Sequence, residues 1–428
     1  MPIPNCPPRP TGPQTGVGRL ETEIHVVTPM FGGGYEARNP DADFPIRPTA
    51  IRGHLQFWWR ATHPAPAGMT SAELFAEHEK IWGSTKKKSL VSVQVELLSQ
   101  DNVKPCAEWV RNHKDKWQLR WLTPFDGGSM DSPNPLHYVL FPFQGKRTDI
   151  IYTIPSSFFP KLKFKLSISF PTDQRDPVER ALRAWINFGG LGSRTRRGCG
   201  SLYTKNWSFT SPQETRDWLQ KNGIRSTHDW PTLATSLLHG ETNLSPMDAW
   251  KKSVAPLQTF RQGEDVARNP RQHGDKSPKR SRFPEPETIR GLTNKSDPMH
   301  QDLAHPPGFP RAQFGMPIVV HFQSRLDPSD TTILPENGFQ RMASPLILKA
   351  LATGEDNAFP LILHLNTRLP SHVELHGPNG VFQGSTTMPV CSPLFGQIRN
   401  SPMGKHSSAL DAFLDFAEFN NDFLRGGN

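Results

Sequence analysis

The segment from Phe188 to Gly200 constrains the fold of this chain most, because it places five glycines and three arginines in thirteen residues. It lies between a helical pattern and a strand pattern. Glycine is favoured where the backbone takes a positive φ or passes close to another group. Exposed amides beside arginines form a concave anion site. One phosphate needs only one glycine turn, so the length of this segment predicts a loop that follows several phosphates of an RNA backbone.

Two nucleotide-binding motifs differ from this segment. The dinucleotide fingerprint requires a glycine three residues after Gly192, but Thr195 stands there. The P-loop ends in Gly-Lys-Ser/Thr, which is absent here. The run from Arg197 to Gly200 begins like a strand of the RNA recognition motif, but it lacks the aromatic residues that stack bases. A glycine-rich hairpin with incidental arginines is the remaining alternative.

The glycine spacing from Gly190 to Gly200 is glycine, hydrophobic residue, glycine, five residues with basic members, glycine, any residue, glycine. This spacing resembles the glycine-rich loop of the RAMP superfamily of CRISPR proteins without a departure. The resemblance implies RNA contacts along the loop. The predicted contact residues are Gly190, Gly192, Ser193, Arg194, Thr195, Arg196, Arg197, Gly198 and Gly200.

Length and composition agree with a multidomain protein that binds a polyanion. The chain has 428 residues, enough for two or more domains with real cores. Its net charge of +9 favours a polyanionic partner, although so modest an excess supports RNA only together with local clusters. The 43 prolines and 33 glycines predict long irregular connections.

The cysteines and the apolar runs predict a cytoplasmic protein with no metal, no cofactor and no membrane partner. The four cysteines are widely scattered and include no Cys-x-x-Cys pair, which argues against a zinc site or a disulfide framework and favours a reducing cytosol. No apolar run approaches the roughly 18 residues of a membrane helix. The proline-rich N-terminus lacks the apolar centre of a signal peptide.

Hydrophobic periodicity in the first half predicts a ferredoxin-like βαββαβ order, with the glycine-rich segment before the last strand. A helix opened by Asp176, with Pro177 at its first position, leads into that segment. A second helix over 72–81 and an insertion over 99–150 interrupt the order. The six predicted elements are a strand over 19–27, a helix over 51–60 opened by Thr49, strands over 89–98 and 164–170, the helix from 176 and a strand over 201–207.

The helix over 51–60 carries two different faces. Ile51, Leu55 and Trp58 form a core face, whereas Arg52, Gln56, Trp59 and Arg60 gather on another face. Guanidinium groups beside an aromatic plane grip phosphates and stack a base. Arg52, followed by Gly53, is unfavourable near a helix N-terminus and so predicts an RNA partner. For Trp59 and Arg60, burial in a broad core face stays open as the alternative.

Three segments together resemble one class of RAMP subunit. Ile51-Arg52-Gly53 with Phe57 to Ala61, Glu79 with Trp82-Gly83-Ser84, and Gly189 to Ser201 look like the first-numbered RAMP subunit of the type III-B (Cmr) CRISPR effector. Similar members often have Phe in place of Trp82. Three further matches lie in the second half, over 282–291, 309–318 and 341–349.

The resemblance implies an α+β fold of two ferredoxin-like RAMP domains packed together, with long insertions, over 1–209 and 210–428. Arg290, Arg341 and Lys349 are predicted RNA contacts in the second domain, and Arg341 and Lys349 are expected near one surface. Pairing between Glu287 and Arg290 is the structural alternative. Local patterns add helices opened by Ser211 and Ser245, strands over 318–322, 359–365 and 373–376, a polar basic loop over 261–282 and a helix from 408.

By resemblance, the chain is a non-catalytic RNA-binding subunit that sits near the 3′ part of the crRNA and helps to capture target RNA. Its partners would be crRNA, single-stranded target RNA and other Cmr subunits, and base pairing by the guide would supply sequence specificity. One alternative is a metal-independent ribonuclease that uses His25 or His54 as general base. Another is a protein–protein scaffold whose basic surface makes only incidental contact with RNA. The three lysines Lys86 to Lys88 are interpreted as a solvated turn, with RNA contact as the alternative.

Overall fold

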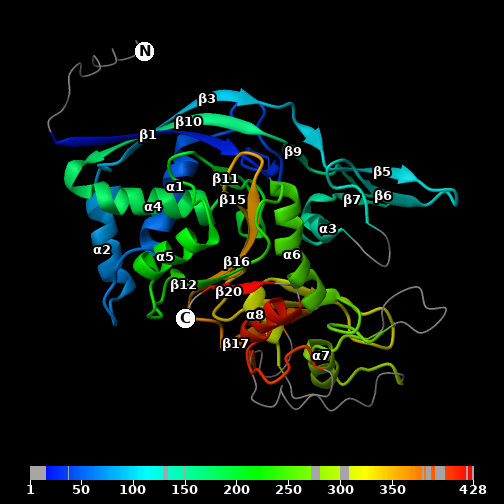
Figure 1. Cartoon of the computed structure of the whole chain (residues 1–428). Helices are drawn as coiled ribbons and strands as arrows, with labels where there is room; N and C mark the ends of the chain where they lie inside the picture. The colour runs from blue at the N-terminus through cyan, green and yellow to red at the C-terminus, as the bar shows by residue number, and fades with distance from the viewer. Residues whose placement is uncertain are drawn as a thin grey trace, which may run out of the picture.

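Two four-stranded antiparallel sheets organise the computed structural model of the chain (Figure 1). The structure describes residues 16–36, 38–128, 134–148, 150–270, 280–298, 308–377, 380–381, 387–390, 401–420 and 423–426. Helices and strands are mixed along the chain, so the predicted α+β class is confirmed. In the described part, no helix is both long enough and apolar enough to cross a bilayer.

The first sheet has the ferredoxin-like order that the sequence predicts. Its strands lie in the order β11-β1-β10-β3, and each pairs antiparallel with its neighbours. With chain order βαββαβ, this is the predicted arrangement, and α2 (Ser71–Trp82) is an addition after the first helix. The six elements are β1 (Val17–Val26), α1 (Pro48–Ala61), β3 (Ser92–Gln100), β10 (Leu162–Pro171), α4 (Arg175–Phe188) and β11 (Leu202–Tyr203).

The second sheet repeats this plan, with its strands in the order β15-β16-β12-β20. The expectation of a second ferredoxin-like unit is therefore confirmed. The predicted boundary between residues 209 and 210 falls between β11 and α5 (Pro212–Asn222) and stays a prediction. The six elements are β12 (Thr232–His239), α6 (Pro246–Gln262), β15 (Leu346–Ala352), β16 (Ala358–Asn366), α8 (Ala409–Asn420) and β20 (Leu424–Gly426).

Both units contain insertions between the elements of the ferredoxin-like plan. In the first unit the hairpin of β5 and β6 projects from the body (Figure 1). The first unit adds β2 (Met30–Phe31), β4 (Lys104–Pro105), β5 (Ala107–Arg111), β6 (Trp117–Trp121), α3 (Pro135–Leu140), β7 (Lys146–Arg147), β8 (Tyr152–Thr153) and β9 (Ser157–Phe159). The second adds α7 (Glu285–Thr293), β13 (Ile318–Val320), β14 (Thr331–Pro335), β17 (His372–Gly377), β18 (Gly380–Val381) and β19 (Thr387–Pro389). Short 3-10 turns are η1 (Phe141–Phe143), η2 (Thr172–Gln174), η3 (Thr195–Arg197) and η5 (Pro310–Phe314).

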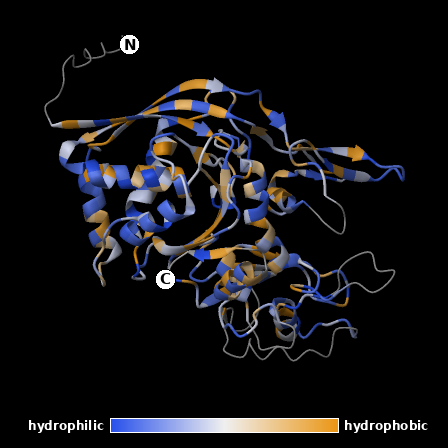
Figure 2. Ribbon diagram, viewed as in Figure 1, coloured by the Kyte–Doolittle hydropathy of each residue, from blue (hydrophilic) through white to orange (hydrophobic). Residues whose placement is uncertain are grey.

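The two units pack so that the second sheet is covered on both faces. All seven residues of β15 are buried, as expected when both faces of a strand are covered. Ile347 and Leu351 belong to the core shared with α1 and α4, whereas Leu346 and Leu348 pack with α6 and α8. The strands of the first sheet instead alternate hydrophobic and hydrophilic residues, because only their inner face is covered (Figure 2).

Several predicted boundaries shift for local reasons. α1 begins at Pro48 with Arg47 as N-cap, and Gln174 rather than Asp176 caps α4. The last strand of the first sheet ends at Tyr203, because the amide of Thr204 donates to Ser208 Oγ and turns the chain. Leu97 on the edge strand β3 is exposed, although the period-two pattern of this strand would place it on the inner face.

The second half follows its local signals more closely. Ser211 and Ser245 each cap the helix that they were predicted to open. The first residues of the predicted 261–282 loop belong to α6, and residues 271–279 of it lie outside the described residues.

Candidate nucleic-acid interface

The glycine-rich loop between α4 and β11 folds back on itself and lies against the chain that follows β1. The amide of Leu191 donates to Gly200 O at 2.9 Å, which closes the loop. The amide of Ser193 donates to Phe31 O at 2.6 Å, and Thr28 Oγ1 donates to Gly198 O at 2.7 Å. These contacts fix the inner side of the loop and leave Gly192 to Arg196 partly exposed.

Two glycines are required by close backbone approaches in the left-handed region. Gly198 has φ 87°, and a Cβ there would lie 2.3 Å from the indole of Trp250. Gly200 has φ 63°, and a Cβ there would lie 2.0 Å from Leu191 O. Side chains rarely adopt such φ values, so the glycines permit both the turn and the packing of the loop against the second unit.

Arg197 has a different environment from the one that the sequence predicts. It is buried, and its guanidinium donates to Leu346 O and Ser344 Oγ, each at 2.9 Å. Burial lowers the pKa of Arg197 to about 9. The backbone carbonyl of Arg197 accepts from Trp250 Nε1. The predicted phosphate contact of Arg197 is therefore wrong, because this side chain is enclosed and anchors the loop to β15.

Lys349 performs a similar anchoring role from the second unit. It is fully buried on β15, and its Nζ donates to Gly189 O at 2.8 Å and lies 3.5 Å from Ile186 O, at the C-terminal end of α4. A cation is favourable at a helix C-terminus. Burial nevertheless lowers the pKa of Lys349 to about 7. Arg341 is exposed, so the expectation that these two side chains share a surface is wrong.

Arg194 and Arg196 remain at the partly exposed side of the loop. Arg194 adopts a left-handed backbone with φ 57°. Arg196 donates to Ser344 O at 2.6 Å and lies over the ring of Phe57 on α1. Burial lowers the pKa of both guanidinium groups. Their backbone amides and that of Thr195 have no hydrogen-bond acceptor within the described part of the chain.

Arg261, the first residue of the predicted polar basic loop over 261–282, also joins this cluster. It comes from the end of α6 and donates to Tyr138 Oη at 2.8 Å, and Tyr138 lies on α3 in the insertion of the first unit. Arg194, Arg196 and Arg261 all lower the pKa of Arg197 electrostatically, which places four guanidinium groups together. Among the described residues, none of the four pairs with a carboxylate. The arrangement is therefore an electropositive surface with no carboxylate partner in the part of the chain that the structure describes.

Helix α1 supplies the next predicted residues. Arg52 donates to Trp82 O at 2.6 Å and Arg60 lies 3.2 Å from His78 Nε2, so both point toward α2. Burial together with Arg60 and Arg52 lowers the pKa of His78 to about 4, so this histidine is a neutral partner. Gly53 faces open space. Trp59 is only 3% exposed and cannot stack a base, so its predicted contact is wrong and the core alternative is confirmed.

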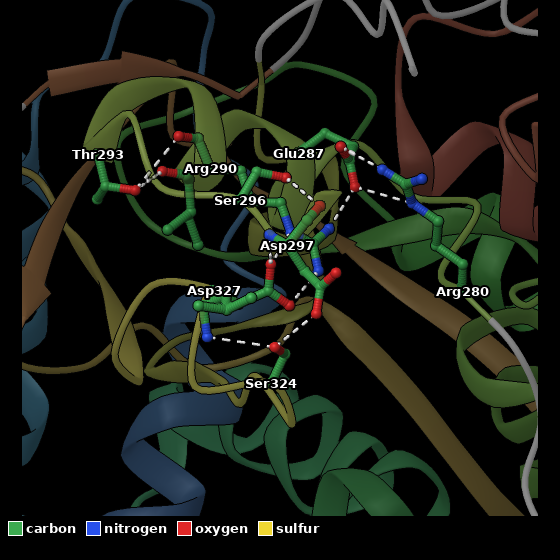
Figure 3. A network of polar contacts seen from close by, with 10 residues as sticks. Arg280, Glu287, Arg290, Thr293, Ser296, Asp297, Ser324 and Asp327 are labelled. Carbon is green, nitrogen blue, oxygen red and sulfur yellow. Dashed lines mark hydrogen bonds and ion pairs between the residues drawn. The ribbon is translucent and has the colours of Figure 1, made fainter. Parts of the chain in front are cut away.

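Arg290 is occupied by carboxylates instead of RNA. Its guanidinium donates to Asp327 through Nε–Oδ1 at 2.8 Å and Nη2–Oδ2 at 2.9 Å, and Nη1 donates to Glu287 Oε1 at 2.5 Å. Figure 3 shows this buried network, in which Arg280 also contacts Glu287. The predicted RNA contact of Arg290 is wrong because its charge is compensated internally, and the Glu287 alternative is confirmed.

The histidines of the nuclease alternative lie in ordinary surroundings. His25 on β1 lies 3.1 Å from Glu23 and 3.2 Å from Glu355. His54 stacks on Trp185, and burial lowers its pKa. Neither imidazole hydrogen-bonds to a residue of the glycine-rich loop. Lys86, Lys87 and Lys88 are all exposed, and Lys87 pairs with Glu79.

The cysteines and acidic residues form no metal centre within the described ranges. No group of three or more His, Cys, Asp or Glu side chains is placed there to hold an ion. Cys106 and Cys199 are free and buried, while Cys6 and Cys391 lie outside the described residues.

Two solved structures are similar to the chain in fold. The crystal structure of Cmr1 from Pyrococcus furiosus in its apo form has 16% sequence identity and a TM-score of 0.44, with 83% of this chain and 90% of that chain covered. A chain of the cryo-EM structure of the Type III-B Cmr-beta bound to cognate target RNA has 13% identity and a TM-score of 0.43, with 92% and 99% covered.

Comparison of sequences gives the class of protein. Residues 23–203 match the model of the RAMP superfamily. The CRISPR system Cmr subunit Cmr1-2 of Pyrococcus furiosus is 30% identical over 191 residues, which are 42% of this chain and 91% of that relative. Cmr1-1 of the same organism is 26% identical over 160 residues, 37% of this chain and 40% of that relative. The chain belongs to the RAMP superfamily. Within it, the chain is a member of the Cmr1-like family of Cmr subunits.

Proposed function

We propose that this Cmr1-like chain binds RNA through its glycine-rich loop as a non-catalytic subunit of a Cmr effector complex. It sits near the 3′ part of the crRNA, contacts neighbouring Cmr subunits and helps to capture target RNA. Family membership supports the assembly, and base pairing by the guide supplies the sequence specificity.

One observation carries the proposal: the guanidinium cluster at the loop has no carboxylate partner in the described chain. Taking charges out of water is unfavourable unless a partner of opposite charge compensates them. A phosphate supplies that charge and forms short charge-assisted hydrogen bonds with guanidinium and amide donors. The unpaired amides of Arg194, Thr195 and Arg196 lie on the same partly exposed turn.

The proposed contacts divide into two groups with different tasks. Arg197 and Lys349 hold the loop on β15 and do not touch RNA, and Trp59 and Arg290 have no part in the site. Arg261 joins the RNA contacts because it lies with the loop arginines. The residues that remain in the proposed interface are Arg52, Gly53, Arg60, Gly192, Ser193, Arg194, Thr195, Arg196 and Arg341. The predicted contacts Gly190, Gly198 and Gly200 are buried and shape the loop instead.

Salt-dependent binding tests the phosphate contacts. The variant Arg194→Ala/Arg196→Ala should lose about 25-fold in affinity for single-stranded RNA at 0.1 M salt, since each neutralised phosphate contributes a log–log slope of about −0.7. Its slope should be less steep by about 1.4. Fluorescence anisotropy measures both quantities, and circular dichroism checks the fold.

A matched control comes from the outer face of the first sheet. Lys163→Ala/Lys165→Ala also removes two cations, but each of these lysines pairs with a glutamate. Its RNA affinity should stay close to that of the wild type. A well-folded loop variant that binds like the wild type, with an unchanged salt slope, contradicts the proposal.

The non-catalytic part of the proposal has its own test. RNA incubated with the purified chain should keep its length on a denaturing gel. Specific cleavage that His25→Ala or His54→Ala abolishes would replace RNA holding with nuclease activity. Neither substitution touches the loop arginines, so binding and cleavage can be measured separately.

A further inference from the structure

A second loop lies directly against the glycine-rich loop. It spans residues 32–47 between β2 and α1. A Cβ on Gly32 would lie 2.1 Å from Ser193 Oγ, so the two loops touch. Tyr35 follows three residues later, and its Cα therefore lies within about 11 Å of Gly32 Cα.

Internal hydrogen bonds connect the described residues of the 32–47 loop, 32–36 and 38–47. The amide of Gly34 donates to Asn39 O at 3.1 Å. This hydrogen bond places the residue before Tyr35 close to Asn39, which lies two residues before Asp41. Asp41 Oδ1 accepts from the amide of Phe44 at 3.0 Å, and Asp41 Oδ2 accepts from Arg47 at 3.1 Å. Tyr35 and Phe44 are thus attached to the same small framework.

External contacts fasten this turn to the first unit. The amide of Ser157 donates to Asn39 Oδ1 at 3.1 Å. Arg38 donates to Pro142 O and Gln100 Nε2 donates to Ala42 O, each at 3.2 Å. These three hydrogen bonds hold the turn against the first unit.

Both aromatic side chains of this turn point into solvent. Tyr35 is 83% exposed and Phe44 is 71% exposed, and neither ring contacts another aromatic ring or a guanidinium group in the described structure. Aromatic side chains normally contribute stability by burying their large apolar surface. The exposed rings of Tyr35 and Phe44 belong to one turn, which lies beside the anion-binding glycine-rich loop. They therefore provide surfaces on which flat ligands can stack.

We propose that Tyr35 and Phe44 stack bases of the RNA whose phosphates lie on the glycine-rich loop. This inference rests on the proposed function. Stacking on aromatic side chains is how proteins hold unpaired bases, and it tolerates any sequence because every base has a π-face. The charges of the turn favour bases over phosphates as its ligands, because Glu36, Asp41 and Asp43 outnumber its two arginines.

Two probes separate base stacking from phosphate binding. One is a short single-stranded RNA of mixed sequence, and the other is a strand of equal length and charge whose sugars carry no bases. Tyr35→Ala/Phe44→Ala should weaken binding of the base-bearing strand by about 5- to 150-fold for each stacked base. Binding of the abasic strand should not change. Tyr35→Phe keeps the ring and should bind both strands like the wild type.

A control for the loss of any exposed ring is Phe419→Ala. Phe419 is 80% exposed on α8 in the second unit, and its removal should leave both affinities unchanged. Circular dichroism and thermal unfolding verify that each variant is folded.

The outcomes separate failure of this inference from failure of the proposed function. If Arg194→Ala/Arg196→Ala weakens both probes while Tyr35→Ala/Phe44→Ala binds both normally, stacking is excluded and the phosphate site stands. Equal losses on the two probes in the aromatic variant also exclude stacking, because the abasic strand has nothing to stack. If the wild-type chain binds neither probe, both proposals fail.

Discussion

Two basic regions of the molecule differ in how their charges are compensated. On the outer face of the first sheet, Lys163 lies 2.6 Å from Glu23, while Lys165 and Arg19 lie 3.0 and 2.6 Å from Glu21. These lysines lower the pKa of both glutamates through hydrogen bonds. At the glycine-rich loop, by contrast, four guanidinium groups share one neighbourhood with no described carboxylate.

The difference shows that the number of cations does not locate a polyanion site. RNA recognition motifs use the open face of a ferredoxin-like sheet to stack bases. Here that face carries a ladder of ion pairs, so its charges are satisfied within the protein. The missing counter-charges at the loop point to the place where an external anion is needed.

The largest expected effect comes from breaking the contact that holds the uncompensated cluster on the second unit. Gly198→Val places a branched side chain at φ 87° against the indole of Trp250. Overpacking and the left-handed backbone together should lower the free energy of unfolding by about 2–5 kcal/mol. Urea denaturation measures the loss of unfolding free energy. RNA affinity should also fall, because the loop arginines are no longer held in place against the second unit.

Gly53→Ala is the matched control for this substitution. Gly53 lies within α1 and a Cβ there meets nothing within 4 Å. Alanine in a helix should raise the free energy of unfolding by about 0.5–1 kcal/mol. If the Gly198→Val chain were as stable as the wild type, the packing of the loop against Trp250 and β15 would not contribute to stability.

Burial of Lys349 should make the stability of the chain depend on pH. Its folded pKa of about 7 lies below the ordinary value of 10.5, so between these values the unfolded chain binds a proton that the folded chain does not. Stability therefore rises with pH above about 7, by at most about 1.4 kcal/mol per pH unit. Relative to Lys349→Met, the wild type should gain stability from pH 7 to pH 9. Parallel urea curves for the two proteins over this range would contradict a buried, neutralised lysine.

The sequence predicted those elements whose signals are local. β1 and β10 follow the period-two alternation of a strand with one covered face. Ser211 and Ser245 were identified as helix starts because a cap and its Pro and acidic residue lie within one turn. The glycine-rich loop was located for the same reason, since its spacing is contained in one short segment.

Burial that depends on the packing of two units was not predictable in this way. Lys349 in β15 resembles the polar position of a half-exposed strand, but helices of the first unit cover that face. Arg197 was predicted to contact RNA because it stands beside Arg194 and Arg196 in the glycine-rich loop. Its hydrogen-bond partners Ser344 and Leu346, however, lie some 150 residues later in the chain. Arg261 and Tyr138 meet across 123 residues, and no periodicity links them.

The smallest expected effect comes from removing the carboxylates of the sheet face, so that its cations are as uncompensated as those of the loop. Glu21→Gln/Glu23→Gln removes the two carboxylates that Arg19, Lys163 and Lys165 share and leaves three cations uncompensated. RNA affinity at low salt should rise by about 5-fold or more, with a steeper salt slope, since even one extra phosphate contact adds about −0.7. Combining these changes with Arg194→Ala/Arg196→Ala should restore part of the lost affinity at low salt but not at high salt. If removing the carboxylates leaves the slope unchanged, internal compensation is not what separates the two surfaces.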